Sequence, residues 1–164
     1  MTEERKLLLL EKLERGGSKA IAYFRTLPPS VWQLTIHRGE GWRVRDLLAH
    51  FVSAEIHLLT LALTMMAGKP GAPDGLNIDE FNQQEQARLA EIPVEDLLDQ
   101  LAAARRETIT WLQSLPADQL AREVRHPVLG EISLETFVES IYGHQLLHMR
   151  ELRQVLEDTP SAAS

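Results

Sequence analysis

Two histidines stand four residues apart near the carboxyl end of the sequence, in the stretch GHQLLHMRELR at residues 143–153. Residues four apart share one face of a helix, so the imidazoles of His144 and His148 can bind one metal ion together. The alternative is that both are polar residues tolerated on a hydrophobic stripe. A third inward-facing ligand from another helix would favour the metal.

His50 offers such a ligand, because it lies among apolar residues that recur every three or four positions. His57 follows seven residues later on the same face, about 10 Å further along the helix axis. Spacing alone does not choose between them. Three imidazoles plus water leave an open coordination position, which is the arrangement of catalytic zinc. His37 and His126 are expected in loops, as solvated polar residues.

Four stretches with helical apolar periodicity would position these side chains. They are expected over residues 2–26, 42–67, 78–115 and 133–157. Gly16 and Gly17 weaken the first, because each glycine costs about 1 kcal/mol against alanine in a helix. Pro93 is expected to split or kink the third, and Ser133 to cap the last. The connection before Ser133 is predicted to hold one helical turn and an extended piece around Val128.

The pattern as a whole predicts an all-α four-helix bundle, since no convincing strand pattern accompanies the helices. We expect a single bundle domain over residues 1–157 and a disordered polar tail over residues 158–164. The amino terminus, MTEERKLLLLEKLERG, has only four leucines between charged flanks. That is neither a signal peptide nor a membrane span, so we expect a cytoplasmic protein with no membrane partner.

Composition narrows the chemistry. The 164 residues carry a formal net charge of −7, which argues against a nucleic-acid partner because such proteins normally show a basic face. The sequence contains no cysteine, so a cysteine nucleophile and a thiolate–metal site are excluded. Any metal must therefore be held by histidine, aspartate or glutamate.

Two stretches resemble the DinB/YfiT-like superfamily of metal-binding four-helix bundles, which includes DinB-like, thiol-dependent and ClbS/DfsB-like members. WRVRDLLAHFVSAE, residues 42–55, has the pattern W-x-x-x-[DE]-x-x-x-H, and YGHQLLHMREL, residues 142–152, carries H-x-x-x-H. The stretch IDEFNQQEQARLAEIPVEDLLDQLAAARRE is similar to the superfamily's third helix, with Asn82 at a position where asparagine is often found.

The resemblance implies that His50, rather than His57, joins His144 and His148 around one divalent ion. Zinc, nickel and iron all suit imidazole, so the ion is not named by its ligands. Asp46 matches the superfamily's acidic position. The resemblance also implies a helix order other than simple up-down-up-down, and a homodimer. Val138, Met149 and Leu156 lie beside the inward stripe of the last helix and could form such an interface.

Three functions remain open at this point. The first is a metal-dependent hydrolase, or a thiol-dependent transferase or isomerase, that acts on a small molecule. The second is a bundle that binds or sequesters a small molecule or metal without turnover, and the third is a structural dimer without metal. A general base is not identified: Tyr142, Glu139 and His57 are near in sequence, and each also has an ordinary surface or core interpretation.

Overall fold

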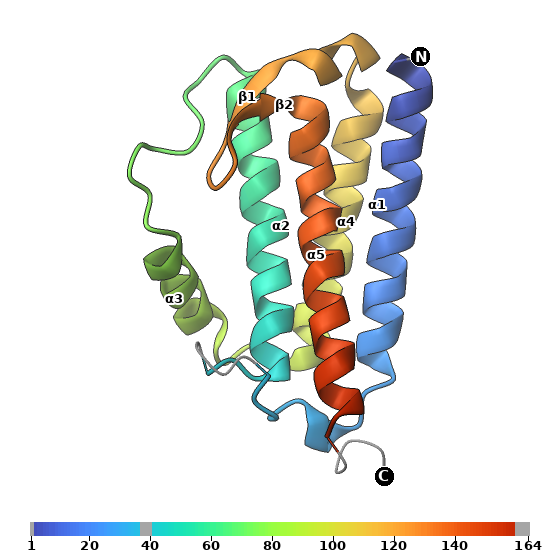
Figure 1. Cartoon of the computed structure of the whole chain (residues 1–164), viewed down its shortest axis with the longest axis vertical. Helices are drawn as coiled ribbons and strands as arrows, with labels where there is room; N and C mark the ends of the chain where they lie inside the picture. The colour runs from blue at the N-terminus through green and yellow to red at the C-terminus, as the bar shows by residue number, and fades with distance from the viewer. Residues whose placement is uncertain (1, 37–40, 160–164) are drawn as a thin grey trace.

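Four long helices run side by side along the long axis of the molecule (Figure 1). The computed structural model describes residues 2–36 and 41–159. The four helices are α1 (Thr2–Arg25), α2 (Val44–Met66), α4 (Val94–Ser114) and α5 (Leu134–Glu157). The predicted all-α four-helix bundle is therefore confirmed. The second helix begins at Val44 rather than at Trp42, after a short 3₁₀ helix, η1 (Pro29–Val31).

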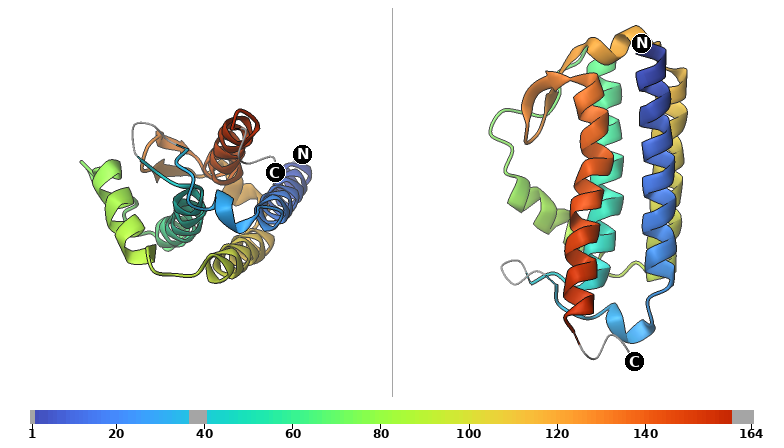
Figure 2. Two further views of the ribbon diagram at one scale, coloured as in Figure 1. Left: turned by 90° about the horizontal axis from the view of Figure 1, so that it is seen from below. Right: turned by 45° about the vertical axis from the view of Figure 1, so that its right-hand side comes forward.

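The four bundle helices do not follow a simple up-down-up-down order along the chain. In Figure 1, α1 and α5 run downward from the end that holds the amino terminus, and α2 and α4 run upward. Helix α1 packs between α4 and α5, and α2 packs against the same two helices from the opposite side (Figure 2). Consecutive helices α1 and α2 are thus diagonal partners. Because α2 and α4 are parallel neighbours, the chain needs a long return connection between them, and this connection contains α3 (Ile78–Leu89).

Two apolar clusters fill the bundle. The first includes Phe24, Leu48, Leu98, Leu101 and Leu152, and the second includes Leu13, Ala62, Leu112, Phe137 and Ile141. Burial of each large apolar side chain stabilises the fold by about 1.5–3 kcal/mol. A polar layer made of Glu55, Arg105, Thr108 and Gln145 lies between the clusters, and all four side chains are buried.

The polar layer joins all four bundle helices through Arg105 on α4. Its Nε and Nη2 donate to the carboxylate of Glu55 on α2 at 2.7 and 2.8 Å. Nη2 also donates to Oε1 of Gln145 on α5 at 3.0 Å, and Nη1 to the carbonyl of Leu13 on α1 at 2.6 Å. Thr108 donates to Glu55 Oε1 at 2.9 Å. A buried ion pair that is this fully hydrogen-bonded offsets much of its desolvation cost.

The Gly16–Gly17 pair does not interrupt α1, which continues unbroken to Arg25. A Cβ atom on Gly17 would lie only 3.0 Å from Cγ and 3.1 Å from Nη1 of Arg105. A Cβ on Gly16 would instead make ordinary contacts near 4 Å with Tyr142 and Arg105. Gly17 therefore makes room for the Arg105 guanidinium.

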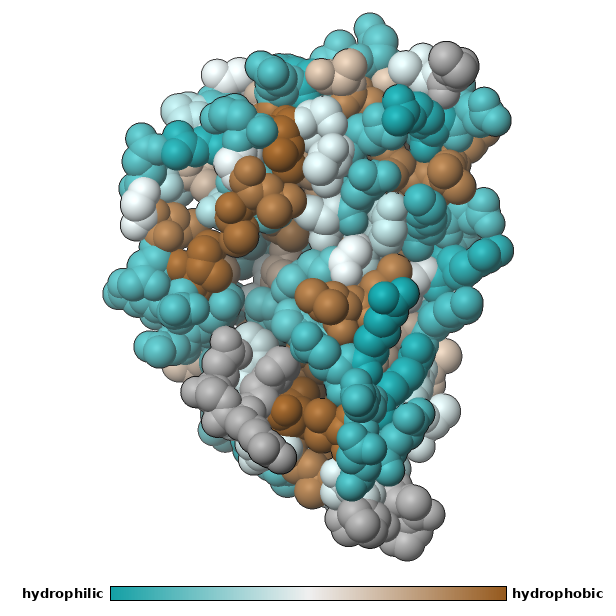
Figure 3. All heavy atoms as spheres, viewed as in Figure 1, coloured by the Kyte–Doolittle hydropathy of each residue, from teal (hydrophilic) through white to brown (hydrophobic). Residues whose placement is uncertain are grey.

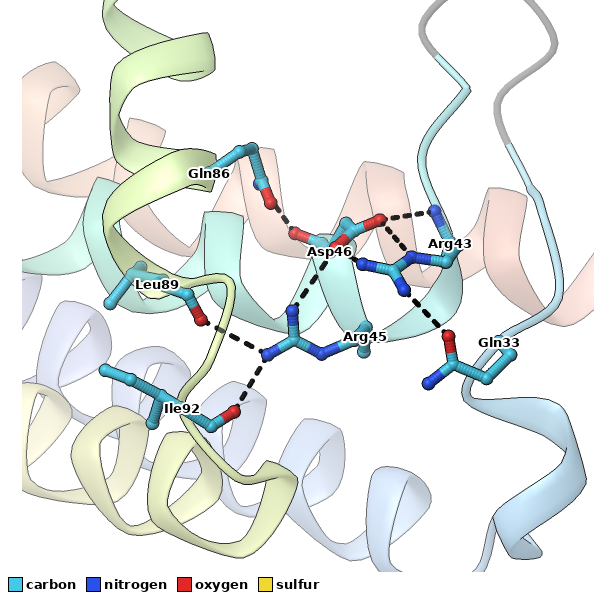
Figure 4. Close-up of polar contacts among 7 residues, drawn as sticks. All are labelled: Gln33, Arg43, Arg45, Asp46, Gln86, Leu89 and Ile92. Atoms are coloured by element: carbon cyan, nitrogen blue, oxygen red, sulfur yellow. Dashed lines mark hydrogen bonds and ion pairs between the residues drawn. The ribbon is translucent and has the colours of Figure 1, made fainter.

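Helix α3 is held beside the start of α2 by polar contacts (Figure 4). Nη2 of Arg45 donates to the carbonyls of Leu89 and Ile92, where α3 ends, and Gln86 Nε2 donates to the carbonyl of Asp46. The predicted break at Pro93 is confirmed, since α3 ends at Leu89 and α4 begins at Val94.

A β-hairpin lies between α4 and α5. After a 3₁₀ helix, η2 (Ala117–Ala121), strands β1 (Glu123–His126) and β2 (Gly130–Ser133) pair antiparallel. The expected helical turn is present, and extended strands lie on either side of Val128, which itself lies in the tight turn between them. Gly130 closes that turn with φ of 74°, which glycine adopts without strain. Ser133 caps α5 as expected, accepting from Thr136 N at 3.1 Å.

The residues that the sequence suggested for a dimer interface are buried inside the bundle of a single chain. Val138, Met149 and Leu156 are only 0%, 3% and 8% exposed, because the apolar face of α5 is wide enough to contact both α1 and α2. The dimer loses that support and stays a prediction. Among the described residues, α2 alone is long and apolar enough to cross a membrane, and more than half of its apolar window is buried, as in a core helix.

Candidate metal centre

Helices α2 and α5 bring three histidines together. His50 projects from the first turns of α2, and His144 and His148 project from one face of α5. The Nε2 atom of His144 lies 3.0 Å from Nε2 of His50 and 3.1 Å from Nε2 of His148. One ligand atom from each ring can be chosen so that all three lie within 4.8 Å of one another.

This geometry fits a single divalent ion. Zinc–imidazole bonds of about 2.0–2.1 Å place neighbouring tetrahedral ligands about 3.3 Å apart, close to the two short separations. Proton counting points the same way, because each neutral imidazole carries one N–H and one lone pair. Nε2 of His144 therefore cannot form conventional hydrogen bonds to both neighbouring Nε2 atoms at once, whereas one cation can accept a lone pair from each ring.

The environment keeps His144 neutral. Burial, and after it the charges of His148 and His126, lower the pKa of His144 to about 4, while the charge of Glu151 opposes them. An imidazole must be unprotonated to bind a metal. At neutral pH His144 is therefore neutral and can offer a ring lone pair to a metal ion.

Aromatic side chains surround the cluster. The indole of Trp42 lies against the ring of His50, with centroids 4.8 Å apart, and Phe51 lies 6.4 Å from His144 and 6.1 Å from His148. These rings restrict the rotation of the imidazoles and limit water access from the bundle side. His50 itself is only 7% exposed.

The other histidines are placed elsewhere. His57 faces α3, where its Nε2 lies 3.4 Å from Glu85 and its ring meets the edge of Phe81. The prediction that His126 is solvated is wrong: it ends β1, is 8% exposed and packs on Phe137. Burial alternates along β1, and His126 occupies one of its two buried positions. His37 lies outside the described residues.

The candidate bases do not converge on the cluster. Tyr142 faces α1, where Lys12 lies over its ring, and His57 faces α3. Glu139 is half-buried and precedes His144 by five residues, so it is about 140° away around the helix. Asn82 is half-buried on α3.

Asp46 caps the first turn of α2. Its Oδ2 accepts from the backbone N and from Nε of Arg43, both at 2.9 Å (Figure 4). Burial opposes the charged form of Asp46, but these hydrogen bonds and the charges of Arg43 and Arg45 outweigh it and hold its pKa below the usual value. The carboxylate therefore stays ionised and closes the first turn of the helix that carries His50.

Sequence reasoning missed Glu151, whose Oε2 lies 3.1 Å from Nδ1 of His148. Its position three residues after His148 was the available signal. Sequence reasoning also missed the polar layer, and a small cavity of about 10 Å³ lies between that layer and the cluster. Its lining includes His144, Gln145 and Glu55.

A larger hollow lies at the other end of α2. It has a volume of about 580 Å³ and is bordered by Met65, the loop over residues 68–74, and charged residues of the hairpin region such as Arg122 and Glu131. Met65 is fifteen residues from His50, or about 22 Å along the helix. This hollow is therefore separate from the histidine cluster.

The fold and the cluster define a class: helical bundles that present a histidine trio between two helices. The chain belongs to the DinB superfamily, whose sequence profile matches residues 12–152. No curated protein matches the sequence.

Solved structures share the fold. YfiT from Bacillus subtilis, described as "a probable metal-dependent hydrolase with an unusual four-helix bundle topology", is 18% identical with a TM-score of 0.76, over 96% of this chain and 89% of YfiT. An uncharacterised Escherichia coli UTI89 protein is 18% identical with a TM-score of 0.77, over 93% of both chains. The colibactin self-resistance protein ClbS, solved in complex with double-stranded DNA, is 15% identical with a TM-score of 0.71, over 91% of this chain and 95% of ClbS. Identities this low establish the fold alone.

Proposed function

We propose that this protein binds one divalent metal ion through His50, His144 and His148 and acts as a metal-dependent hydrolase on a small molecule. The observation that carries the proposal is the approach of the three Nε2 atoms, two of whose separations are 3.0 and 3.1 Å. The description of YfiT as "a probable metal-dependent hydrolase" supports the reaction class. A thiol-dependent transferase is the alternative reaction at the same centre.

A divalent ion held by three imidazoles lowers the pKa of a bound water or thiol and so supplies a nucleophile at neutral pH. The chain's own residues prepare the centre for that role. Burial keeps His144 unprotonated, and Trp42 and Phe51 hold the rings. Zinc, nickel and iron each suit the three nitrogen ligands.

A binding or sequestering protein without turnover is the second candidate. The observation in its favour is that Tyr142 and His57, two of the candidate bases, face other helices. Glu151 contacts the nitrogen of His148 that faces away from the cluster, so it is not placed to take a proton from a ligand there. Turnover of ester, amide or thiol-conjugated substrates by the metal-loaded protein would separate the two candidates.

We also propose a cytoplasmic homodimer whose partners are small molecules and not nucleic acid or membrane. The net charge of −7 opposes a phosphate backbone. Tight binding of duplex DNA at physiological salt, as the ClbS complex invites one to test, would overturn that exclusion. Hydrophobic side chains gather around the hairpin (Figure 3), and Val128, Leu129 and Leu147 are exposed. Exposed apolar surface of this kind is typical of a protein interface.

Metal loading tests the function directly. The chelated protein is reloaded with zinc, nickel or iron(II), and the melting temperature is followed. At a hundredfold excess over the dissociation constant, binding to the folded state adds about 2.7 kcal/mol, or about 5–10 °C for a chain of this length. Alanine at His50, His144 or His148 should abolish most of this shift.

His57→Ala is the matched control, because it removes an imidazole from the same face of α2 but one that contacts α3. It should keep the full shift. Metal binding by His50→Ala that equals the parent's would show that the ligand set is wrong.

A further inference from the structure

Glu151 contacts the outer nitrogen of a candidate metal ligand. It follows His148 by three residues on α5, so the two side chains are neighbours on the helix surface. Oε2 of Glu151 lies 3.1 Å from Nδ1 of His148, and Nε2 of the same ring lies 3.1 Å from Nε2 of His144. The ring of His148 thus bridges a carboxylate on one side and the histidine cluster on the other.

The carboxylate determines where the proton of a neutral His148 resides. An ionised carboxylate only accepts hydrogen bonds, so Nδ1 of His148 must be the donor in this contact. A neutral imidazole carries one N–H proton, so a proton on Nδ1 leaves Nε2 with a lone pair. That lone pair lies toward His144, where the proposed metal would be bound.

The contact also determines the rotation of the ring. Histidine χ2 is broad and roughly two-fold, so packing alone distinguishes poorly between a ring and its half-turn flip. The flip would exchange Nε2 with the carbon Cε1 at the cluster and Nδ1 with Cδ2 beside Glu151. Neither carbon can replace the nitrogen, so the flipped ring loses the hydrogen bond and the metal ligand together.

We propose that Glu151 is a positioning residue, which holds His148 in the Nδ1–H tautomer with the lone pair of Nε2 toward His50 and His144. Its consequence for metal affinity rests on the proposed function, whereas its consequence for the tautomer does not. The side chain of Glu151 is 47% exposed, so the contact adds little to folding stability. Its effect is on ligand geometry.

Metal affinity gives the first readout. Glu151→Ala should weaken binding of zinc to the chelated protein by about 10–100-fold, the usual effect of removing a carboxylate behind a metal-bound histidine. Glu151→Gln should lose less, because the amide oxygen still accepts from Nδ1. Glu157→Gln is the matched control: it removes the same charge from an exposed position on the same helix and should change affinity less than about twofold, as expected for a distant screened charge.

The tautomer of His148 in the metal-free protein gives the second readout, through long-range ¹H–¹⁵N spectra of the imidazole rings. The parent should show a protonated Nδ1, and Glu151→Ala should show a mixture of tautomers. If the parent binds no metal but the tautomer changes, the proposed function fails and the positioning role stands. If His148→Ala abolishes metal binding while Glu151→Ala binds zinc as tightly as the parent, the positioning role is refuted and the proposed function stands.

Discussion

Replacing Gly17 by alanine should destabilise the bundle, although alanine is the better helix former. The new Cβ would lie 3.0 Å from Cγ and 3.1 Å from Nη1 of Arg105. The guanidinium cannot easily retreat, because it donates to Glu55, Gln145 and the carbonyl of Leu13. The methyl group therefore displaces a side chain that is hydrogen-bonded on several sides and buried.

The magnitude follows from two opposing contributions. Alanine in place of an interior glycine stabilises a helix by about 0.5–1 kcal/mol. Loss or distortion of one charged, buried hydrogen bond costs about 1.5–3 kcal/mol. Gly17→Ala should therefore lower the free energy of unfolding by about 1–2 kcal/mol, or about 2–8 °C in Tm.

Gly16→Ala is the matched control on the neighbouring residue. Its Cβ would meet Tyr142 and Arg105 at 3.9 and 4.0 Å, which are ordinary contacts, so only the helix-propensity gain remains. It should raise the free energy of unfolding by about 0.5–1 kcal/mol. Urea unfolding of both variants at pH 7 measures the difference. Equal stabilisation by the two substitutions would refute the packing role assigned to Gly17.

Two further predictions concern pH and assembly. In the metal-free protein the pKa of His144 is about 4, against 6.5 for an unperturbed histidine, because burial and then the charge of His148 disfavour protonation. Between pH 6.5 and pH 4 the unfolded state therefore binds more protons than the folded state. The contribution of neutral His144 to the free energy of unfolding is fully present above about pH 6.5 and falls by up to about 3 kcal/mol toward pH 4. Urea unfolding of the parent and His144→Asn across this range should show a shallower pH dependence for the variant, and parallel curves would contradict the assignment. Light scattering at micromolar concentration should give a dimeric mass, and a monomeric mass would contradict the proposed assembly.

The helices could be predicted from the sequence because each carries its own apolar period. Which histidine of α2 joins the cluster could not be predicted from spacing. His50 and His57 share one face of α2, and spacing treats them alike. The position of α3 distinguishes them, because the side chain of His57 contacts Glu85 and Phe81 on α3. Only the resemblance to a known family selected His50 beforehand.

Long-range partners explain the other differences. The inward face of α5 contacts two helices, so Val138 and Met149, which the sequence suggested for an interface, are buried within one chain. His126 was assigned to a loop because β1 is only four residues long, too short to show a clear strand period. Its Nδ1 accepts from the backbone N–H groups of Val128 and Leu129, and so holds the hairpin turn.

Adjacent residues of α5 serve the two polar systems of the bundle. His144 belongs to the histidine cluster, and Gln145, the next residue, accepts from Arg105 in the polar layer. Glu55 connects the same layer to α2, five residues after His50. A metal centre tolerates ligand displacements of only about 0.5 Å, and apolar packing alone permits helices to slide or rotate more easily than directional hydrogen bonds do. The Glu55–Arg105–Gln145 contacts therefore fix α2 relative to α5 at the level where His50 must meet His144.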